Sequence, residues 1–400
     1  MASTSGGGLV AARRSKSRRD DFDGPVGRPL KVCVTGLRGI PNVMGGVETH
    51  CEELYPRIHR LHPDIDVELL ARAPYTGPHG YRFSGVRVTP LRAVKSKHFE
   101  AISNTLLAVL YARFRTRADV LHIHAIGPGL FAPLARLLGL RTIVTHHGRD
   151  YERAKWNGVA SAVLAAGEWC AFAAADKVLV VSKWLAADLA RQYPKQAHKI
   201  IYAPNGVPDA AAPSSNVEGQ SVLARLGLEP SRYILAVGRL VPEKGFHDLL
   251  DAFEKSDGPM KLVFAGSADH EDDYARALIR RASDRVVFAG RLDRESLNTL
   301  YEHAERFVLP SHHEGLPLVA LEAARWNCAM VLSDIPANLD LGLPASNYYP
   351  VGNVEALERK LLEAANPLRV DGEELGRRFD WNVVADRTAD TYTNTQQTRH

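Results

Sequence analysis

The sequence is poor in cysteine, and the cysteines it has are scattered. None of them forms a C-x2-C pair, so neither a zinc site nor a disulfide framework is predicted. Core thiols of this kind fit a reducing cytoplasm. The four residues are Cys33, Cys51, Cys170 and Cys328.

A long uninterrupted apolar run is also lacking. The longest apolar stretch, residues 159–175, is interrupted by Ser161, Gly167 and Glu168. Its alanine-rich composition predicts a buried helix rather than a transmembrane span. The N-terminal residues lack the apolar core of a signal peptide, so we expect a cytoplasmic protein.

Strong charge of either sign is absent as well, because the formal net charge is only +4. With 45% hydrophobic residues the composition is that of an ordinary globular protein, and no nucleic-acid partner is predicted. The basic residues nevertheless gather in a glycine- and serine-rich segment, residues 1–29, which we expect to be a disordered tail. They are Arg13, Arg14, Lys16, Arg18 and Arg19.

The length of 400 residues predicts two domains rather than a single core. From Pro29 onward short apolar runs alternate with helical patterns, which predicts doubly wound α/β domains with parallel sheets. The break Pro204-Asn205-Gly206 precedes a linker, residues 207–218, between domains at 30–206 and 219–378. The predicted strands begin near Lys31, Val67, Val86, Val120, Thr142, Val178 and Ile200, and then near Tyr233, Leu262, Arg285, Arg306 and Ala329.

Glu314 and Glu322 form an E-x7-E pair that follows the predicted strand Arg306–Leu309. A helix expected to start at Pro317 would direct its free N–H groups towards a phosphate. Glu314 would lie on the loop before this helix. Glu322 would lie about a turn inside it, where a carboxylate can accept hydrogen bonds from vicinal hydroxyls. This arrangement suits a sugar nucleotide, although the pair by itself also fits a capped helix with solvated carboxylates.

Other strand ends carry polar or glycine-rich loops, and ligands of doubly wound sheets bind at these ends. The loop after the first strand contains Gly45-Gly46 but no G-x-G-x-x-G, so a hydride-transfer enzyme is a poor interpretation. Another loop begins His146-His147-Gly148, and spacing does not decide which imidazole points to the cleft. In the second domain Arg239 and Lys244 suit a leaving diphosphate.

In this order the motifs resemble those of the retaining glycosyltransferases of family 4 (glycosyltransferase group 1). The family has the GT-B fold, two Rossmann-like domains facing a central cleft. A subgroup with rhamnosyltransferases of bacterial surface polysaccharides is similar around Arg38-Gly39-Ile40-Pro41. The matching segments are Gly45-Gly46-Val47-Glu48, His147-Gly148, Asn205-Gly206, Gly238-Arg239-Leu240, Lys244-Gly245, Phe288-Ala289-Gly290 and Pro310–Ala323.

The resemblance implies that Arg239 and Lys244 hold the donor diphosphate and that Glu322 holds the ribose hydroxyls. It places Glu314 against the donor sugar and His147 beside the anomeric centre, so His147, Glu314, Arg239 and Lys244 are the predicted catalytic residues. It also implies a C-terminal helix, residues 379–400, that crosses back to the first domain. The other predicted donor-binding residues are Gly45, Gly46, Gly290, Arg291, Leu292, Gly315, Leu316 and Leu318.

The family pattern is not matched everywhere. Trp326-Asn327-Cys328-Ala329 stands where the family commonly has Cys-Gly-Thr-Pro. Asn327 is still expected to adopt the left-handed conformation that ends a helix. Asp64-Ile65-Asp66 has the spelling of a metal-binding motif but precedes a strand, so we expect a turn there.

The predicted function is transfer of a hexose from a nucleoside diphosphate sugar to a saccharide or lipid-linked acceptor with retention of configuration. Neither a metal nor a further cofactor is expected, and the setting is bacterial polysaccharide or glycolipid synthesis. A nucleotide-sugar 2-epimerase of the same fold and a non-catalytic nucleotide-sugar binder are the alternatives.

An anionic membrane surface is a further candidate partner. The predicted apolar helix Ala101–Tyr111 is flanked by basic residues, which are attracted to anionic lipid. The alternative is that its leucines face the core, as amphipathic helices usually do in globular domains. The flanking residues are Arg92, Lys95, Lys97, Arg113, Arg115 and Arg117.

Overall fold

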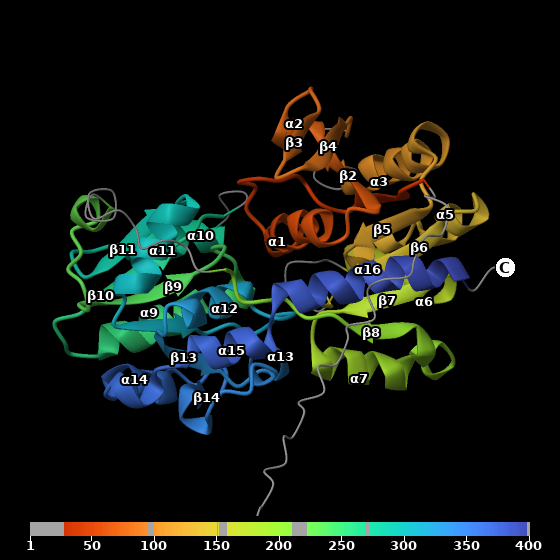
Figure 1. Cartoon of the computed structure of the whole chain (residues 1–400). Helices are drawn as coiled ribbons and strands as arrows, with labels where there is room; N and C mark the ends of the chain where they lie inside the picture. Colours follow the sequence, from red (N-terminus) through yellow and green to blue (C-terminus); the bar gives the residue numbers. More distant parts are fainter. Residues whose placement is uncertain are drawn as a thin grey trace, which may run out of the picture.

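The computed structural model describes residues 28–94, 100–149, 151, 158–209, 222–268 and 273–397. They form two α/β domains, each built on its own sheet (Figure 1). Residues 1–27 of the predicted basic tail and most of the predicted linker lie outside the described residues, as do Lys95 and Lys97. Within the described residues, no helix is long and apolar enough to span a bilayer.

The first domain has an 8-stranded sheet in the order β3-β4-β2-β1-β5-β6-β7-β8. Its neighbouring strands pair in parallel except for β3 and β4. The bounds are β1 Leu30–Thr35, β2 Ile65–Arg72, β3 Tyr81–Phe83, β4 Val86–Leu91, β5 Val120–His124, β6 Arg141–His146, β7 Lys177–Val180 and β8 Ile200–Tyr202.

The second domain has a 6-stranded parallel sheet in the order β11-β10-β9-β12-β13-β14. Its central strands are buried apart from Lys261 and are rich in Val, Leu and Phe, as expected where helices cover both faces. The bounds are β9 Tyr233–Val237, β10 Lys261–Ala265, β11 Val286–Gly290, β12 Arg306–Leu309, β13 Ala329–Ser333 and β14 Tyr348–Tyr349.

Helices connect the strands and cover the sheets. In the first domain they are α1 Gly46–Leu61, α2 Ala73–Thr76, α3 Glu100–Leu110, α4 Ile126–Gly129, α5 Ala132–Leu137, α6 Gly158–Ala174 and α7 Lys183–Gln192, with a π-helical turn at Tyr111–Thr116. In the second domain they are α9 Phe246–Lys255, α10 Asp273–Ile279, α11 Arg294–His303, α12 Leu318–Arg325, α13 Pro336–Leu339, α14 Val354–Leu362 and α15 Gly372–Arg378.

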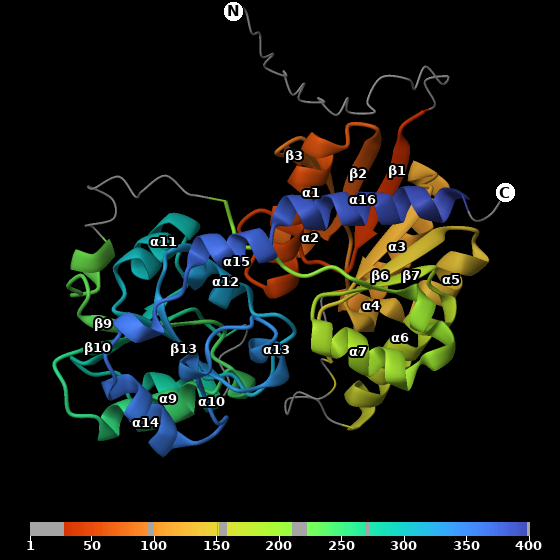
Figure 2. The ribbon, with the colours of Figure 1, turned by 60° about the horizontal axis from the view of Figure 1, so that its bottom comes forward.

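The last helix, α16 (Trp381–Gln397), follows α15 but lies along the first domain (Figures 1 and 2). It packs against α1, and its buried side chains join the core of that domain. A β-bridge between Val207 and Asp380 brings the segment after β8 beside the start of this helix. The buried residues of α16 in this core are Trp381, Val384, Ala385, Ala389 and Tyr392.

The predicted strands are all present, with ends that differ by a residue or two. Strands β3 and β14 were not predicted, because they have only 3 and 2 residues and show no measurable alternation. Asp64 lies in a turn before β2, as expected. Asn327 has φ 52°, which confirms the left-handed conformation expected after α12.

Two local predictions were wrong. The stretch at residues 159–175 does form a helix, α6, but one side of it is open to solvent, with Val159 77% and Trp169 62% exposed. The alanine-rich composition had predicted a buried helix, because it does not show which side of the helix faces solvent. Pro317 is the N-cap of α12 rather than its first helical residue, because its ψ of 105° is extended.

Candidate active site

Loops from the two domains meet where the strands end. The β-carbon that Gly148 would carry lies 3.4 Å from Cα of Gly315, so the loop after β6 touches the loop after β12. A small recess separates Gly148, Ser182 and Trp184 on one side from His313, Glu314 and Gly315 on the other. It leaves about 10 Å³, which is room for about one water molecule. The two domains are therefore closed on each other here.

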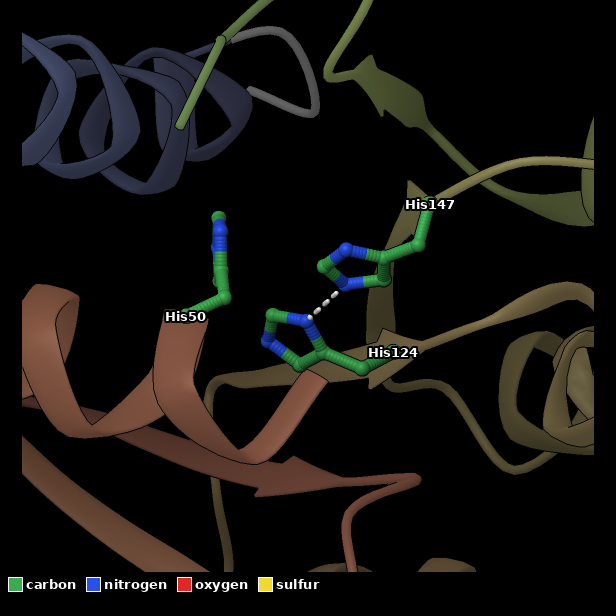
Figure 3. Close-up of side chains that lie close together, drawn as sticks. All are labelled: His50, His124 and His147. Atoms are coloured by element: carbon green, nitrogen blue, oxygen red, sulfur yellow. Dashed lines mark hydrogen bonds between the residues drawn. The ribbon is translucent and has the colours of Figure 1, made fainter. Parts of the chain in front are cut away.

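Three histidines lie together at the inner end of the first domain's half of the site (Figure 3). His50 comes from α1, His124 ends β5, and His147 follows β6. The ring of His147 stacks on that of His124 with centroids 5.2 Å apart and meets the ring of His50 edge-on at 4.8 Å. Nδ1 of His124 is 2.9 Å from Nε2 of His147. The imidazoles of His50 and His124 thus hold the ring of His147 in place.

Burial keeps these imidazoles uncharged. It is the largest cause that lowers the pKa of His50 to about 4 and the pKa values of His124 and His147 well below the usual 6.5. The neighbouring histidines push the pKa values of His124 and His147 down further. At neutral pH each ring therefore offers one N–H and one lone pair.

Asn205 connects this cluster to the second domain. Its Oδ1 is 2.8 Å from Nδ1 of His50, and its Nδ2 donates to the carbonyl oxygen of Leu316 at 2.8 Å. All three residues are buried. The side chain of Asn205, which follows β8, therefore links α1 of the first domain to the E-x7-E segment of the second.

Glu314 is held by a cation and a hydroxyl on its own domain. Nζ of Lys244 lies 2.6 Å from Oε1 of Glu314, and Ser311 donates to the same oxygen at 2.7 Å. Lys244 ends a 3-10 turn that leads into α9, and Arg239 precedes this turn. Arg239 lies 4.0 Å from Glu243. The structure thus brings Lys244 and Glu314 together, with Arg239 on the same loop.

Glu322 lies on α12, where Tyr301 donates to its Oε2 at 3.0 Å. Burial raises the pKa of Glu322, whereas the hydrogen bond from Tyr301 and the charge of Arg294 lower it. Arg294 also forms an ion pair with Glu53 of α1 at 2.5 Å. The second carboxylate of the E-x7-E pair is therefore placed close to the domain boundary.

The glycine-rich loop before α1 is closed by an ion pair. Nε of Arg38 lies 3.2 Å from Glu48, and the backbone N–H of Arg38 donates to the same carboxylate at 2.9 Å. A β-carbon on Gly45, which has φ 153°, would lie 2.0 Å from Glu48 Oε2. Gly46 has open space around it. Of the pair Gly45-Gly46, the packing of this loop therefore requires a glycine at position 45 but not at position 46.

The remaining predicted donor-binding residues divide into two groups. Gly290 and Arg291 lie at the end of β11, and Arg291 hydrogen bonds to the carbonyl oxygen of Asn42 in the glycine-rich loop. Leu292, Leu316 and Leu318 pack their side chains against hydrophobic cores. Any contact of Leu316 or Leu318 with a donor therefore has to use backbone atoms.

Among the described residues, two clusters of side chains have the donor atoms for a metal ion. The imidazoles of His50, His124 and His147 are one, and the group of His247, Asp248 and His312, in which Asp248 is buried, is the other. In the second cluster Nε2 of His312 is 2.6 Å from Asp248, which raises the pKa of His312. Neither cluster resembles Asp64-Ile65-Asp66, the motif considered from the sequence.

Family models match both domains. The model for glycosyl transferases group 1 matches residues 224–367, and the model for glycosyltransferase family 4 matches residues 44–211. The chain belongs to the group 1 glycosyltransferases. The prediction of this family is confirmed, and the rhamnosyltransferase subgroup stays a prediction.

Curated relatives of this glycosyltransferase match most of its length. It is 29% identical to alpha-maltose-1-phosphate synthase of Mycobacterium tuberculosis over 88% of this chain and 96% of the relative. It is 28% identical to glycogen synthase of the same organism over 91% of this chain and 94% of that protein. The chain is accordingly similar to glycosyltransferases over both of its domains.

Solved structures confirm the predicted GT-B fold. Sucrose-phosphate synthase from Thermosynechococcus elongatus superimposes with a TM-score of 0.78 at 20% identity, covering 92% of this chain and 100% of that one. Anabaena HepE in complex with UDP-glucose has a TM-score of 0.73 at 16% identity, covering 91% and 100%.

Several residues of this glycosyltransferase site were not predicted from the sequence. Asn205 was noted only as part of a matching motif, and the histidines His50 and His124 were not singled out. The alternation His122-Ile123-His124 at the end of a buried strand was the available signal, since period two puts both histidines on one face. Tyr301 carried no such signal.

A contact between α7 and α13 was also missed. Asp340 accepts a hydrogen bond from the Ser182 hydroxyl at 2.6 Å and one from the backbone N–H of Trp184 at 3.0 Å. A carboxylate of the second domain thus caps a helix of the first. Ser182 and Trp184, the residues that it binds, both line the recess.

Proposed function

We propose that this glycosyltransferase moves a hexose from a nucleoside diphosphate to a saccharide or lipid-linked acceptor with retention of configuration and without a metal. The observation that carries the proposal is the placement of Glu314, held by Lys244 at 2.6 Å, on the loop that touches His147 and Gly148. A sugar bound between these loops has the carboxylate of Glu314 on one side and the imidazole of His147 on the other.

The charges fit the departure of a diphosphate. Arg239 and Lys244 lie on the loop before α9, where cations stabilise the negative charge that grows on the leaving group. Glu322 is set back in α12 and suits the ribose hydroxyls. Because the recess beside Glu314 is small, the domains have to separate before substrates enter, as many two-domain enzymes do.

Relatives support bacterial glycan synthesis as the setting. Alpha-maltose-1-phosphate synthase and glycogen synthase both come from a bacterium, and HepE was crystallised with UDP-glucose. This chain is about equally identical to two synthases with different names, so their names do not assign its acceptor. We infer a glucose-type hexose donor class without assigning its base.

The test starts with a panel of UDP-, ADP-, GDP- and dTDP-hexoses measured for protection against heat unfolding, because a bound ligand stabilises the folded state. The stabilising donor is then incubated with candidate acceptors, and the anomeric configuration of the product is read by NMR. We expect transfer with retention. Formation of an epimer would support the 2-epimerase, and donor binding without any turnover would support a non-catalytic binder.

We also propose that α3 docks the enzyme on an anionic membrane. The leucines, which face the core in the alternative interpretation, are partly exposed, since Leu106 is 38%, Leu107 42% and Leu110 37% exposed, whereas Val109 is buried. Phe114 in the following π-helical turn is 66% exposed beside Arg113 and Arg115. An apolar face with basic neighbours suits the surface of anionic lipid.

Liposome co-sedimentation tests this docking. Leu107→Asp is expected to abolish binding to anionic vesicles, whereas Leu362→Asp, at a residue 60% exposed on the other domain, should not. Binding should weaken with salt. Loss of binding on removal of residues 1–23 would assign the membrane contact to the basic tail instead.

A further inference from the structure

A chain of hydrogen bonds leads from the C-terminal helix to His147. The hydroxyl of Tyr392 on α16 is 2.6 Å from Nδ1 of His122. The hydroxyl of Tyr55 on α1 is 3.0 Å from the same nitrogen and 2.5 Å from Nε2 of His124. Nδ1 of His124 then reaches Nε2 of His147 at 2.9 Å. Before His147, every member of this chain is fully buried.

The imidazoles in this chain of hydrogen bonds are neutral, so each carries a hydrogen on only one of its two nitrogens. Burial is the largest cause that lowers the pKa of His122 to about 3, and it keeps the pKa values of His124 and His147 well below 6.5. Nε2 of His122 lies 2.7 Å from Oγ1 of Thr145 and can donate to it. Nδ1 of His122 then has a single lone pair for two hydroxyls.

The distances decide how the hydroxyls share that lone pair. Hydroxyl donors reach down to about 2.5 Å, whereas N–H donors rarely approach closer than about 2.7 Å. The contact of 2.6 Å marks Tyr392 as the donor to His122. Tyr55 is left to donate to His124 across 2.5 Å, which places the hydrogen of His124 on Nδ1. His124 in turn donates to Nε2 of His147.

We propose that Tyr392 and Tyr55 are positioning residues that act through His122 and His124 to hold His147 in the tautomer with its hydrogen on Nδ1. Nε2 of His147 is occupied by His124, so Nδ1 is the nitrogen left to donate to a substrate oxygen (Figure 3). The crossing of α16 over the first domain then has a catalytic purpose, because it supplies the first donor of the chain.

This inference rests on the proposed role of His147, but its first readout does not. Long-range nitrogen–proton NMR spectra of protein labelled with ¹⁵N-histidine distinguish the two neutral tautomers without any substrate. His147→Gln identifies the His147 signals by their loss. We expect Nδ1 of His147 to carry the hydrogen in the wild type.

Tyr392→Phe removes only the first hydroxyl and keeps the ring that fills the core. Tyr55 can then donate to either histidine, so the His147 signals should show a mixture of both tautomers. The matched control is Tyr349→Phe, which alters a tyrosine 2% exposed whose hydroxyl has no partner among the described residues. The control should leave the His147 signals unchanged.

Kinetics give the second readout. Tyr392→Phe should lower kcat about 10-fold while KM for the donor stays constant. The reason is that the tautomer of His147 affects a hydrogen bond that matters mainly in the transition state. Tyr55→Phe should do the same, and Tyr349→Phe should do neither. A merely structural role would lower the melting temperature without moving the tautomer.

Two results on the tautomer of His147 would overturn the inference. One is a wild-type His147 with its hydrogen on Nε2, and the other is an unchanged tautomer in Tyr392→Phe. A shift of the His50, His124 and His147 signals on adding EDTA would also overturn it, because it would show a metal among nitrogens that lie within 4.8 Å of one another. If the tautomer is as expected but no hexose is transferred, the proposed function fails and the hydrogen-bond chain stands.

Discussion

Gly315 lies so close to His147 that a β-carbon on Gly315 would be 1.7 Å from the carbonyl oxygen of His147. No side chain can be accommodated there without moving one domain relative to the other. The contact joins the loop that carries Glu314 to the loop that carries the predicted catalytic imidazole.

Gly315→Ala is therefore expected to lower kcat by about 100-fold or more, because a displacement of about 1 Å in an active site can cost that much. The melting temperature should change little, since each domain keeps its core. Gly376→Ala, where a β-carbon meets nothing within 4 Å, is the control and should be fully active. Normal turnover in Gly315→Ala would show that the closed contact is not part of the reaction.

His147→Ala should lose roughly 100-fold in kcat with normal folding, because the imidazole acts on charge that develops in the transition state. His146 is different, since its Nε2 lies 2.8 Å from Glu168 and both side chains are only 1% exposed. His146→Ala should cost about 1 to 3 kcal/mol of unfolding free energy, because the buried Glu168 carboxylate loses one partner while Tyr193 and Arg149 remain beside it. Steady-state kinetics and urea unfolding separate the two effects, and equal small losses of kcat would place the wrong histidine at the reaction centre.

Glu322 should act mainly in donor binding and Glu314 mainly in turnover. Glu322→Ala is expected to weaken donor binding by about 1.5 to 3 kcal/mol, because a ribose hydroxyl loses a charged acceptor. Tyr301→Phe should weaken it less, since the carboxylate remains. Glu314→Ala should mainly lower kcat. Calorimetric titration with the donor measures the first effect, and an unchanged affinity in Glu322→Ala would remove that residue from the site.

Dialysis against EDTA should leave activity largely intact, because Arg239 and Lys244 supply the positive charge that a metal would otherwise provide. Arg239→Ala and Lys244→Ala should each lower kcat by about 100-fold or more. Lys255→Ala, at a lysine 51% exposed on the same domain, is the matched control and should be neutral. Loss of activity in EDTA that Mg²⁺ restores would assign this charge to a metal ion.

The buried histidines should make the protein sensitive to acid. The folded-state pKa of His50 is about 4 and its ordinary value is 6.5, so between these pH values the unfolded chain binds a proton that the folded chain does not. Stability is then lost as the pH falls, with a slope of up to about 1.4 kcal/mol per pH unit for one such group. In His50→Gln the curve of unfolding free energy against pH should be flatter by that amount. His79→Gln, at an exposed histidine, should follow the wild type.

The fold was predictable because its signals are local. Strands such as Tyr233–Val237 and Arg306–Leu309 are short apolar runs between helical patterns, and their parallel order follows from that alternation. Lys244 and Glu314 both follow strand ends of one sheet, so the sequence could also predict that they lie close together. The partners of Glu322 and His50 could not be predicted. Tyr301 and Asn205 approach these residues through side-chain packing, which leaves no periodic pattern in the sequence.

The helix α16 has a consequence for how the chain is made. Trp381, Ala385 and Tyr392 are buried against strands and helices that are translated long before them. Domains generally fold as units from the N-terminus during synthesis, but here the first domain cannot complete its core until the second has left the ribosome. A chain shortened before Trp381 should expose the apolar side of α1 and be retained by chaperones, so loss of the final helix would reduce the amount of enzyme in a cell before it affected any catalytic constant.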